Sequence, residues 1–340
     1  MKKKFLYIIL LFLSTKMQVF SADLVALHHN GVATFFTSLT EAVDSAQTGD
    51  TIYIPGHTYN IGSMIIDTRL HIFGVGHFPD STAATDRSYL SGSIHFVAGS
   101  DYSTLTGVYL TGNIHFGTNG TNHDVFNVTV ERCRMNRLYL AEGQSSTSNS
   151  AYNVFRENAI TDWVYGCHTQ NNAFYNNIFA GAVFDFDGFT PFRNNIFVFG
   201  NCYPLNHIIN CSFENNIFIS SCAQYGLDLC DFKNNIFTYS WSPGTGNSGS
   251  GNITGQSPSS VFVNQSGTSF SYSHDYHLKP TSPGKNAGID GQDIGIYGGF
   301  YPFKEGSVPH HPHIQSKTIS NTTDSNGDLN VDIKVRAQDY

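Results

Sequence analysis

Five segments in the middle of the chain repeat one pattern of apolar and polar positions. Each segment starts with Phe, continues with a variable residue and two positions that are usually Asn, and ends with two mostly apolar residues. The five segments start at Phe155, Phe174, Phe192, Phe213 and Phe232, which lie 19, 18, 21 and 19 residues apart. A nearly constant period of about 20 residues predicts a solenoid of stacked coils, each too small to fold alone.

Equivalent residues of such coils form columns, because neighbouring coils lie one strand spacing apart, about 4.8 Å. Phe and Ile are expected to fill the interior, and the residue after Phe is expected to face outward. Asparagine tolerates the left-handed backbone of a sharp bend, and its amide can donate to the next coil. We therefore expect the second Asn of each segment to form a bend column and an asparagine ladder, made by Asn158, Asn177, Asn195, Asn216 and Asn235.

The N-terminal part predicts a capping helix in front of the first coil. Residues 38–48 carry apolar residues at helical spacing, and Ser38 and Glu41 form a capping box. Gly49 is placed to end the helix, and residues 51–54 then predict a strand. Such a helix covers the open apolar end of a solenoid, which would otherwise pair or aggregate.

The repeat is looser on both sides of the five segments. Residues 92–96 return as residues 112–116, which predicts stacked strands with stacked histidines. Residues 241–260 are rich in Gly and Ser and lack the period, so they predict a loop. Residues 294–299 are expected to form the final coil.

The two ends of the chain differ in composition from the solenoid. Three lysines, an apolar run over Phe5–Leu13 and small residues before a cut after Ser21 or Ala22 predict a secretory signal peptide. We therefore expect secretion to the periplasm, the cell surface or the medium. The predicted organisation is a signal peptide (1–21), a β-helix domain (22–300) and a C-terminal tail with one strand (301–340).

Composition and charge narrow the possible partners. Charged residues are only 13% of the chain, and apolar residues are 40%, enough for a sizeable core. The formal net charge is −8, and removal of the signal peptide with its four lysines makes it −12. A nucleic-acid-binding protein carries a basic footprint, so this balance argues against a nucleic-acid partner. No stretch after the signal peptide is long and apolar enough for a transmembrane segment.

The capping helix, the coils of about 20 residues and the asparagine ladder resemble right-handed parallel β-helix proteins of the pectin-lyase-like superfamily. The segments Tyr276–Pro283, Asn286–Gly288 and Asp293–Gly295 also look like the terminal coil of many secreted bacterial members. The resemblance covers residues 35–300 and implies an all-β, right-handed parallel β-helix solenoid. This superfamily contains lyases, hydrolases, isomerases, adhesins and inert spacers, so the fold does not assign the chemistry.

Asp185 and Asp187 are the first candidates for chemistry. Alternation along a strand would place both carboxylates on one face, where they can bind Ca²⁺ or share acid–base work. Asp228 lies about two coils further along the chain. Lyases of the superfamily use a strand-borne Ca²⁺ cluster and a basic residue, and the resemblance suggests Arg193 or Lys233 for the basic role. The alternative is that these side chains are solvated residues on the outside of strands.

Six cysteines offer a second kind of chemistry. They are Cys133, Cys167, Cys202, Cys211, Cys222 and Cys230. Cys211 and Cys230 each precede the Phe of a segment by two residues, so they are expected to stack. Neighbouring coils bring their Cα atoms within disulfide range, and secretion permits oxidation. A ladder of reduced, buried thiols is the alternative.

These observations lead to two hypotheses about a monomeric protein that meets a polysaccharide or cell-surface glycan. One is a divergent polysaccharide lyase or hydrolase, supported by the acidic strand and by outward aromatic residues such as Tyr175 and Tyr239. The other is a non-catalytic surface, adhesion or structural scaffold. A groove that converges on the acidic residues and a basic residue would favour an enzyme, and a flat polar surface would favour a scaffold.

Overall fold

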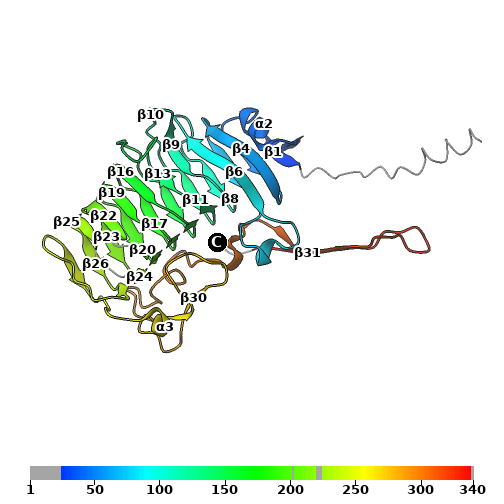
Figure 1. Ribbon diagram of the computed structural model, residues 1–340. Helices are drawn as coiled ribbons and strands as arrows, with labels where there is room; N and C mark the ends of the chain where they lie inside the picture. Colours follow the sequence, from blue (N-terminus) through cyan, green and yellow to red (C-terminus); the bar gives the residue numbers. More distant parts are fainter. Residues whose placement is uncertain (1–23, 201–202, 220–223, 338–340) are drawn as a thin grey trace, which may run out of the picture.

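The computed structural model describes residues 24–200, 203–219 and 224–337. These residues form a parallel β-solenoid of about nine turns, which Figure 1 shows with its coils side by side. The expected signal peptide lies outside the described residues. No described helix has the length and the apolar character needed to cross a membrane.

Each regular coil contributes one strand to a 12-stranded sheet and two strands to a 16-stranded sheet. The 12-stranded sheet has the order β2 (Val32–Phe36), β1 (Val25–His29), β3 (Asp50–Tyr53), β5 (Leu70–Phe73), β7 (Thr104–Thr106), β11 (Thr129–Glu131), β14 (Val154–Arg156), β17 (Ala173–Tyr175), β20 (Pro191–Arg193), β23 (Ser212–Glu214), β26 (Asp231–Lys233) and β28 (Ser248–Ser250). From β3 onward its strands are parallel.

The 16-stranded sheet divides at the long strand β6 (Ser88–Phe96), which pairs with two strands of the next coil. The short-strand arm runs through β8 (Tyr109–Leu110), β12 (Arg134–Met135), β15 (Ala159–Ile160), β18 (Ile178–Phe179), β21 (Ile196–Val198), β24 (Ile217–Ile219) and β27 (Ile236–Phe237). The long-strand arm runs through β9 (Ile114–Thr118), β13 (Leu138–Tyr139), β16 (Val164–Gln170), β19 (Val183–Gly188), β22 (Leu205–Ile209) and β25 (Tyr225–Asp228), with β4 (His57–Ile66) and β10 (Thr121–Asn122) off its path.

The capping helix α2 (Leu39–Asp44) is shorter than the sequence predicts. Ser38 caps it, because its hydroxyl accepts a hydrogen bond from the backbone N–H of Glu41 at 3.3 Å. The helix ends early because the chain must return to the sheet, where Gly49 N–H donates to the carbonyl of Arg69 at 2.7 Å. The antiparallel pair β1–β2 extends the 12-stranded sheet beyond the first parallel coil, so helix and hairpin cap this end together.

The interior consists of two columns of stacked phenylalanine rings, as the repeat predicts. The first Phe of each segment forms one column, with ring centroids 4.7–4.9 Å apart. The last Phe of each segment forms the other, with centroids 4.5–4.8 Å apart. All of these rings are fully buried, and they are Phe155, Phe174, Phe192, Phe213 and Phe232 in the first column and Phe179, Phe197, Phe218 and Phe237 in the second.

The second Asn of each segment forms a continuous hydrogen-bond ladder through the corner between the 12-stranded sheet and the short-strand arm. Asn195 is representative: its Nδ2 donates to the carbonyl of Phe174 and to Oδ1 of Asn216, at 3.0 Å each. Its Oδ1 accepts from N–H and Nδ2 of Asn177 at 2.8 and 3.1 Å. The amide atoms of this column are thereby satisfied by the two neighbouring coils.

The left-handed residue of the bend is the first Asn, not the second. Asn176, Asn194, Asn215 and Asn234 have φ between 50° and 56°, and Glu157 has φ 56° at the same position. The two roles that the sequence predicted for the second Asn are therefore held by two neighbouring residues. The first adopts the strained backbone, and the second supplies the amide that links the coils.

The Ile residues of the segments are not part of the phenylalanine interior. Ile178, Ile196, Ile217 and Ile236 are at most 1% exposed, yet they face away from the Phe columns and belong to a separate apolar cluster. Their partners come from the C-terminal segment (residues 258–310) and are Val261, Phe262, Tyr276, Leu278, Ile294, Ile296 and Phe303. The short-strand arm is therefore buried on both faces, and the expectation that Ile fills the same interior as Phe is wrong.

The C-terminal segment runs back along the solenoid instead of adding a final coil at residues 294–299. It contains α3 (Pro258–Val261), β29 (Phe262–Asn264), β30 (Asp275–Leu278) and η2 (Glu305–Ser307), while η1 (Asp80–Thr82) lies beside η2. The left-handed corner residues hold it through bonds to successive backbone groups, among them Asn234 to Ala287, Asn215 to Ile289, Asn194 to Gly295, Asn176 to Ile296, Glu157 to Lys304 and Arg132 to Val308. Figure 1 shows this segment in yellow and brown along the lower edge of the coils.

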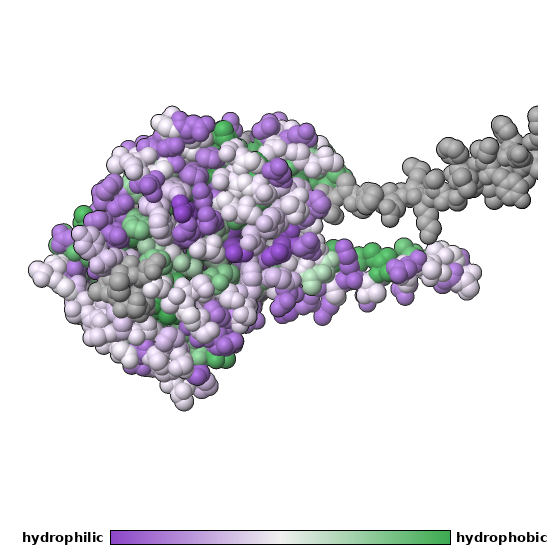
Figure 2. Space-filling model, viewed as in Figure 1, coloured by the Kyte–Doolittle hydropathy of each residue, from purple (hydrophilic) through white to green (hydrophobic). Residues whose placement is uncertain are grey.

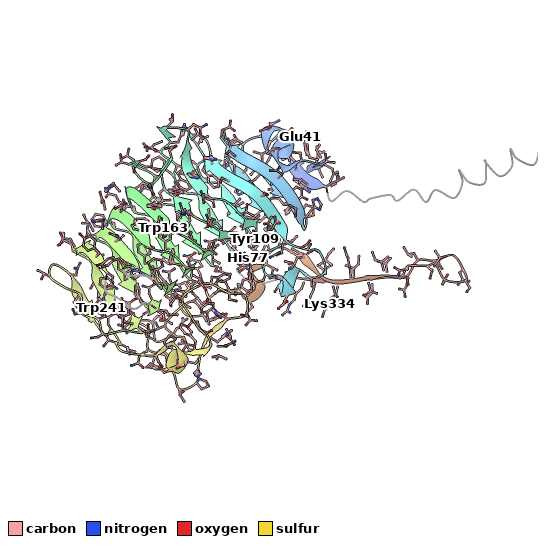
Figure 3. All side chains as sticks on the ribbon, viewed as in Figure 1. Glu41, His77, Tyr109, Trp163, Trp241 and Lys334 are labelled. Atoms are coloured by element: carbon pink, nitrogen blue, oxygen red, sulfur yellow. The ribbon has the colours of Figure 1, made fainter. Side chains whose placement is uncertain are left out.

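The Gly/Ser-rich region expected as a loop contains the last coil. Its strand β28 pairs in parallel with β26, and Asn252 continues the ladder by accepting from Asn235 Nδ2 at 3.0 Å. Gly249 stands where the other coils have Phe, and the ring of Trp241 stacks on Phe237 at a centroid distance of 4.1 Å. Trp241 thereby closes the phenylalanine columns at this end, and it is labelled in Figure 3.

The tail forms an antiparallel hairpin of β31 (His313–Ile319) and β32 (Val331–Arg336) that projects from the solenoid. The strand expected at residues 329–335 corresponds to β32. Figure 2 shows an apolar stripe on the hairpin, where Val331, Ile333 and Val335 are 47–58% exposed.

Candidate functional site

The outer face of the long-strand arm carries a ladder of stacked rings from successive coils. His95 stacks on His115 with centroids 4.7 Å apart, and His115 stacks on Tyr139 at 4.6 Å. Tyr139 stacks on Tyr165 at 5.0 Å, and Tyr165 stacks on Phe184 at 5.0 Å. The predicted stacking of the two histidines is confirmed, and it continues over three further coils.

Backbone covers the N-terminal part of this aromatic ladder. His95 Nδ1 donates to the carbonyl of Gly117, and His115 Nδ1 donates to the carbonyl of Glu142, at 2.7 Å each. These bonds fix the end of β9 and the segment that follows β13 against the ladder. Tyr139 is consequently only 7% exposed.

The C-terminal end of the ladder is open. Trp163 lies edge-on to Phe184 at 5.7 Å, and both rings are partly exposed. Tyr203 and Tyr225, on the following coils, are 44% and 52% exposed and lie 5.3 Å apart. Trp163 is labelled in Figure 3 among the green coils. We call these four residues the open aromatic face.

Two aspartate–histidine pairs lie directly beside the open aromatic face. His168 Nδ1 is 3.0 Å from both carboxylate oxygens of Asp187, and His207 Nδ1 is 3.8 Å from Oδ1 of Asp185. The sequence analysis did not name His168 or His207 as a partner of the acidic pair. The signal was present, because His168 precedes Asp187 by 19 residues, which is one coil.

The backbone of this site departs from regular strand geometry. Asp185, His168 and His207 have φ of 56°, 62° and 52°, and β16 and β19 change register between them. Simple alternation therefore does not hold across β19, and the reason that the sequence analysis gave for pairing the two carboxylates is wrong. Non-glycine residues in the left-handed conformation are enriched at functional sites, where the surrounding structure holds the strained backbone in place.

Electrostatics couples the two carboxylates in spite of the broken alternation. Partial burial raises the pKa of Asp185 above its ordinary value, and the negative charge of Asp187 raises it further. The neighbouring His168 and His207 oppose this increase in pKa. Asp185 is the carboxyl of the site most inclined to hold a proton.

A polar hollow of about 280 Å³ adjoins His168. Its other lining residues are Ser148, Asn149, Ala151, Gln170 and Asn171. The hollow, the aspartate–histidine pairs and the open aromatic face together offer ring surfaces, hydrogen-bonding groups and carboxylates to one extended ligand.

The other candidate residues lie elsewhere. Arg193 lies on β20 in the 12-stranded sheet, where its Nε is 2.8 Å from Oε2 of Glu214. Lys233 lies on the same sheet and pairs with Asp231. Asp228 ends β25, which is separated from β19 by β22. Neither Arg193 nor Lys233 therefore lies on the sheet that carries Asp185 and Asp187.

The aromatic residues named from the sequence are also elsewhere. The ring of Tyr175 packs on Tyr301 of the C-terminal segment at 5.6 Å. Tyr239 accepts a hydrogen bond from Gln224 Nε2 at 2.8 Å, and burial raises its pKa. Both are packing residues rather than parts of an open surface.

The described residues contain no group of three or more His, Cys, Asp or Glu side chains arranged to hold a metal ion. Asp185 and Asp187 are each engaged with a histidine, so the suggested Ca²⁺ site has two carboxylates and, among the described residues, no third carboxylate grouped with them. Ca²⁺ takes six to eight oxygen ligands. The residues present therefore do not fit a resident Ca²⁺.

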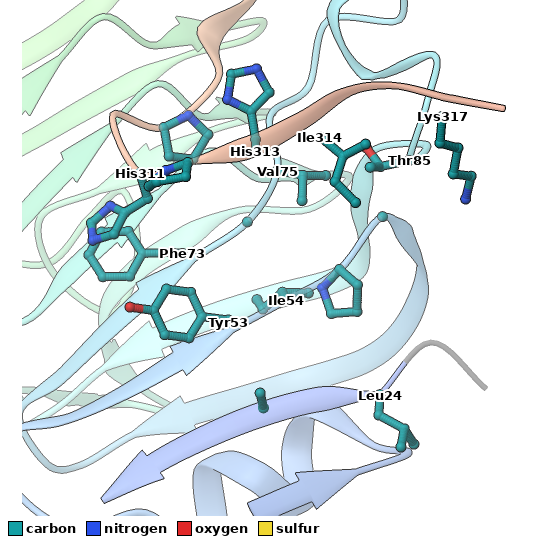
Figure 4. A pocket seen from close by; sticks show the side chains of 16 residues that line it. Leu24, Tyr53, Ile54, Phe73, Val75, Thr85, His311, His313, Ile314 and Lys317 are labelled. Carbon is teal, nitrogen blue, oxygen red and sulfur yellow. The ribbon is translucent and has the colours of Figure 1, made fainter. Parts of the chain in front are cut away.

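A larger apolar pocket of about 410 Å³ lies at the other end of the molecule, between the first coils and the tail. Figure 4 shows its wall of rings, in which Phe73 lies 5.8 Å from Tyr53 and 4.1 Å from His311. No sequence-predicted site residue lines it.

Cys133, Cys167, Cys211 and Cys230 are free, buried thiols, and Cys202 and Cys222 lie outside the described residues. Burial raises the pKa of all four thiols, to about 12 for Cys133 and Cys167. A thiol whose pKa is far above the ambient pH stays protonated and is a poor nucleophile.

In a Cys202→Ser/Cys222→Ser variant we therefore expect almost no reaction with Ellman's reagent at pH 8 in the native state and four thiols per chain after unfolding without reductant. Detection of only two thiols after unfolding would instead establish a disulfide, for which the stacked pair Cys211 and Cys230 is the expected origin.

Comparisons of this chain with protein-family models, with curated proteins and with solved structures found no match, so its fold and its site rest on the residues described above.

Proposed function

We propose that this protein is secreted and binds a polysaccharide across the open aromatic face and the adjoining aspartate–histidine pairs. The observation that carries the proposal is the break in the covering of the aromatic ladder at Trp163 and Phe184, next to Asp185 and Asp187. Sugar rings have apolar C–H faces and polar edges. A surface that combines aromatic rings with carboxylates and imidazoles complements both.

The shape of the site favours an extended ligand over a small molecule. The open aromatic face spans several coils, and each coil adds about 4.8 Å along the solenoid axis. The hollow beside His168 is open and polar rather than an enclosed apolar cavity. A chain of sugar units can contact rings on successive coils and place one unit at the hollow.

The aspartate–histidine pairs support catalysis as a second candidate function. A carboxylate at Nδ1 orients an imidazole and leaves its Nε2 available to take or give a proton. With Asp185 inclined to hold a proton, the site contains both a candidate base and a candidate acid. These are the groups that a divergent polysaccharide hydrolase or lyase requires, and a His168→Gln variant that binds but no longer releases sugar would support turnover.

The alternative is that the protein is a non-catalytic surface or adhesion scaffold. The outer face of the 12-stranded sheet supports this alternative. Strands β11, β23 and β28 of that sheet present small residues such as Thr129, Ser212 and Ser248 beside the paired charges of β20, β23 and β26. A scaffold with a glycan-binding face and no turnover satisfies the binding proposal equally well.

Replacement of Trp163 or Phe184 with alanine is expected to weaken binding to a soluble β-glucan about tenfold or more, because partly buried aromatic residues dominate binding surfaces. Affinity electrophoresis against a panel of soluble glycans measures the change. Phe300, which is 89% exposed on the C-terminal segment, gives the matched control, and Phe300→Ala is expected to bind like the parent chain. Equal losses in all three variants would contradict a site on the long-strand arm, and no binding to any glycan would contradict the proposed function.

A further inference from the structure

We infer that the polysaccharide recognised at the open aromatic face is uncharged, a neutral hexose or pentose polymer rather than a polyuronate. This inference rests on the proposed function and names the ligand class of the same site. It departs from the acidic substrates that lyases with this type of fold cleave, and it follows from the charges that surround the face.

The strands of the long-strand arm contain no lysine or arginine. This holds for each of its described strands from β4 to β25, whereas Asp185, Asp187 and Asp228 lie on β19 and β25. The charged groups of the strands that face a bound glycan are therefore carboxylates and imidazoles. A polyuronate brings one further carboxylate per sugar unit.

The guanidinium of Arg137, which lies beside Trp163, is already paired with a carboxylate. Arg137 lies over the ring of Trp163 at 4.9 Å, and its Nε is 2.6 Å from Oδ2 of Asp162. This pair has no net charge, and it fills one side of the indole. A uronate at the open side of Trp163 would have no unpaired cation to meet, while a neutral sugar can stack there without a charged partner.

The two aspartates already repel each other. Partial burial is the main cause that raises the pKa of Asp185, and the charge of Asp187 adds a smaller increase that His168 and His207 oppose. A further negative charge beside the two carboxylates would add to their repulsion. Like charges placed next to each other at an interface cost several kcal/mol and serve to reject wrong partners. The acidic pair therefore acts against polyuronates in addition to its hydrogen bonds to neutral sugars.

A bridging Ca²⁺ is the usual way to join a uronate to protein carboxylates. It needs several oxygen ligands, and the described residues offer only two carboxylates, each held by a histidine. If the ligand is neutral, the lyase reaction is excluded and hydrolysis is the one remaining candidate reaction. β-Elimination needs the acidic C–H beside a uronate carboxyl group, so turnover at this site would be hydrolysis.

The inference is tested with the full secreted chain and four soluble polymers: mixed-linkage β-glucan, arabinoxylan, polygalacturonate and alginate. Affinity electrophoresis is run with Ca²⁺ and with EDTA. We expect at least one neutral polymer to retard the protein equally in both conditions and neither polyuronate to retard it in either. Binding of a polyuronate that is lost in Trp163→Ala would overturn the inference while preserving the proposed function, and its dependence on Ca²⁺ would identify a bridging ion. Retardation by none of the four polymers would overturn both.

A pair of charge variants tests the cause. Asp185→Asn/Asp187→Asn removes two charges at the face, and Glu41→Gln/Asp332→Asn removes two exposed charges on the capping helix and the tail hairpin. The face variant is expected to gain retardation by polygalacturonate, while the control is expected to show none, like the parent chain. Absence of retardation by polygalacturonate in both variants, with neutral-polymer binding intact, would overturn the electrostatic argument. Circular dichroism verifies that both variants are folded.

Discussion

Asn195→Ala is expected to lower the free energy of unfolding by about 3–5 kcal/mol. The side chain is fully buried and takes part in four hydrogen bonds with Asn177, Phe174 and Asn216. Alanine leaves the amide groups on both neighbouring coils without partners, in a corner where a replacement water has no access from solvent. Each buried polar group left unsatisfied costs about 1–3 kcal/mol. Urea denaturation followed by circular dichroism measures the loss.

Arg193→Ala provides the control from the same coil. Its side chain is 45% exposed and pairs with Glu214 on the outside of the 12-stranded sheet. Exposed ion pairs contribute about 0–1 kcal/mol, so this variant is expected to remain close to the parent. If both variants lost similar stability, the ladder would not be a special source of stability, and the asparagines would serve only the local bend.

The ladder illustrates how much of the fold the sequence predicts. The period and the repeated Asn and Phe give the solenoid, the columns and the internal rings, because a fixed spacing can be read without knowing any contact. The assignment of the left-handed bend to Asn158 rather than to Glu157 was wrong, because both positions accept residues that tolerate a bend. Only the path of the backbone distinguishes them.

The path of the C-terminal segment along the solenoid could not be predicted from the sequence, for a different reason. The segment lacks the period, and its contacts with the corner residues connect positions 53 to 176 residues apart. One signal was available: in Asn-Asn-Ile-Phe both residues of the short strand are large and apolar, which is typical of a strand buried on both faces. This pattern indicates a cover over the Ile residues without identifying it.

The sequence identifies Asp185 and Asp187 as candidates, but it does not give the arrangement of the residues around them. Asp185 and Asp187 are paired with histidines beside an open ring surface, whereas Arg193 lies on another sheet. The register between β16 and β19 changes, so the two carboxylates do not follow the expected alternation. One extra residue in a strand turns every later side chain to the opposite face. A bulge of this kind has no signature in the period of the repeat.

The covering of the solenoid is unevenly distributed and leaves rings of the long-strand arm exposed. The C-terminal segment covers the short-strand arm, and paired charges and small residues occupy the 12-stranded sheet. The long-strand arm is covered only over its first coils, where the carbonyl groups of Gly117 and Glu142 hold the histidines of the ladder. The uncovered rings lie on the coils that carry Asp185, Asp187 and their histidine partners, so packing and chemistry indicate the same coils.

Ile217→Ala tests the second apolar layer and is expected to lower the free energy of unfolding by about 2–5 kcal/mol. Ile217 is fully buried between the short-strand arm and the C-terminal segment, and it lies directly beneath Gly295. Gly295 has φ 93°, and a Cβ on it would come within 2.7 Å of Ile217 Cδ1, so the two backbones approach closely here. The truncation leaves a cavity that neither side can easily fill, because the hydrogen bond from Gly295 N–H to the carbonyl of Asn215 at 2.8 Å fixes their spacing.

Ile209 is the matched control for this variant, because it also lies on a solenoid strand but is 40% exposed. Ile209→Ala is expected to cost less than about 1 kcal/mol, since surface substitutions away from special features change stability little. Hydrogen exchange adds a local measurement. The amide of Gly295 should exchange faster in Ile217→Ala and at the parent rate in Ile209→Ala. Equal stability of the two variants, with unchanged exchange at Gly295, would mean that the C-terminal segment does not pack on the Ile column, and the short-strand arm would then expose an apolar face along the solenoid.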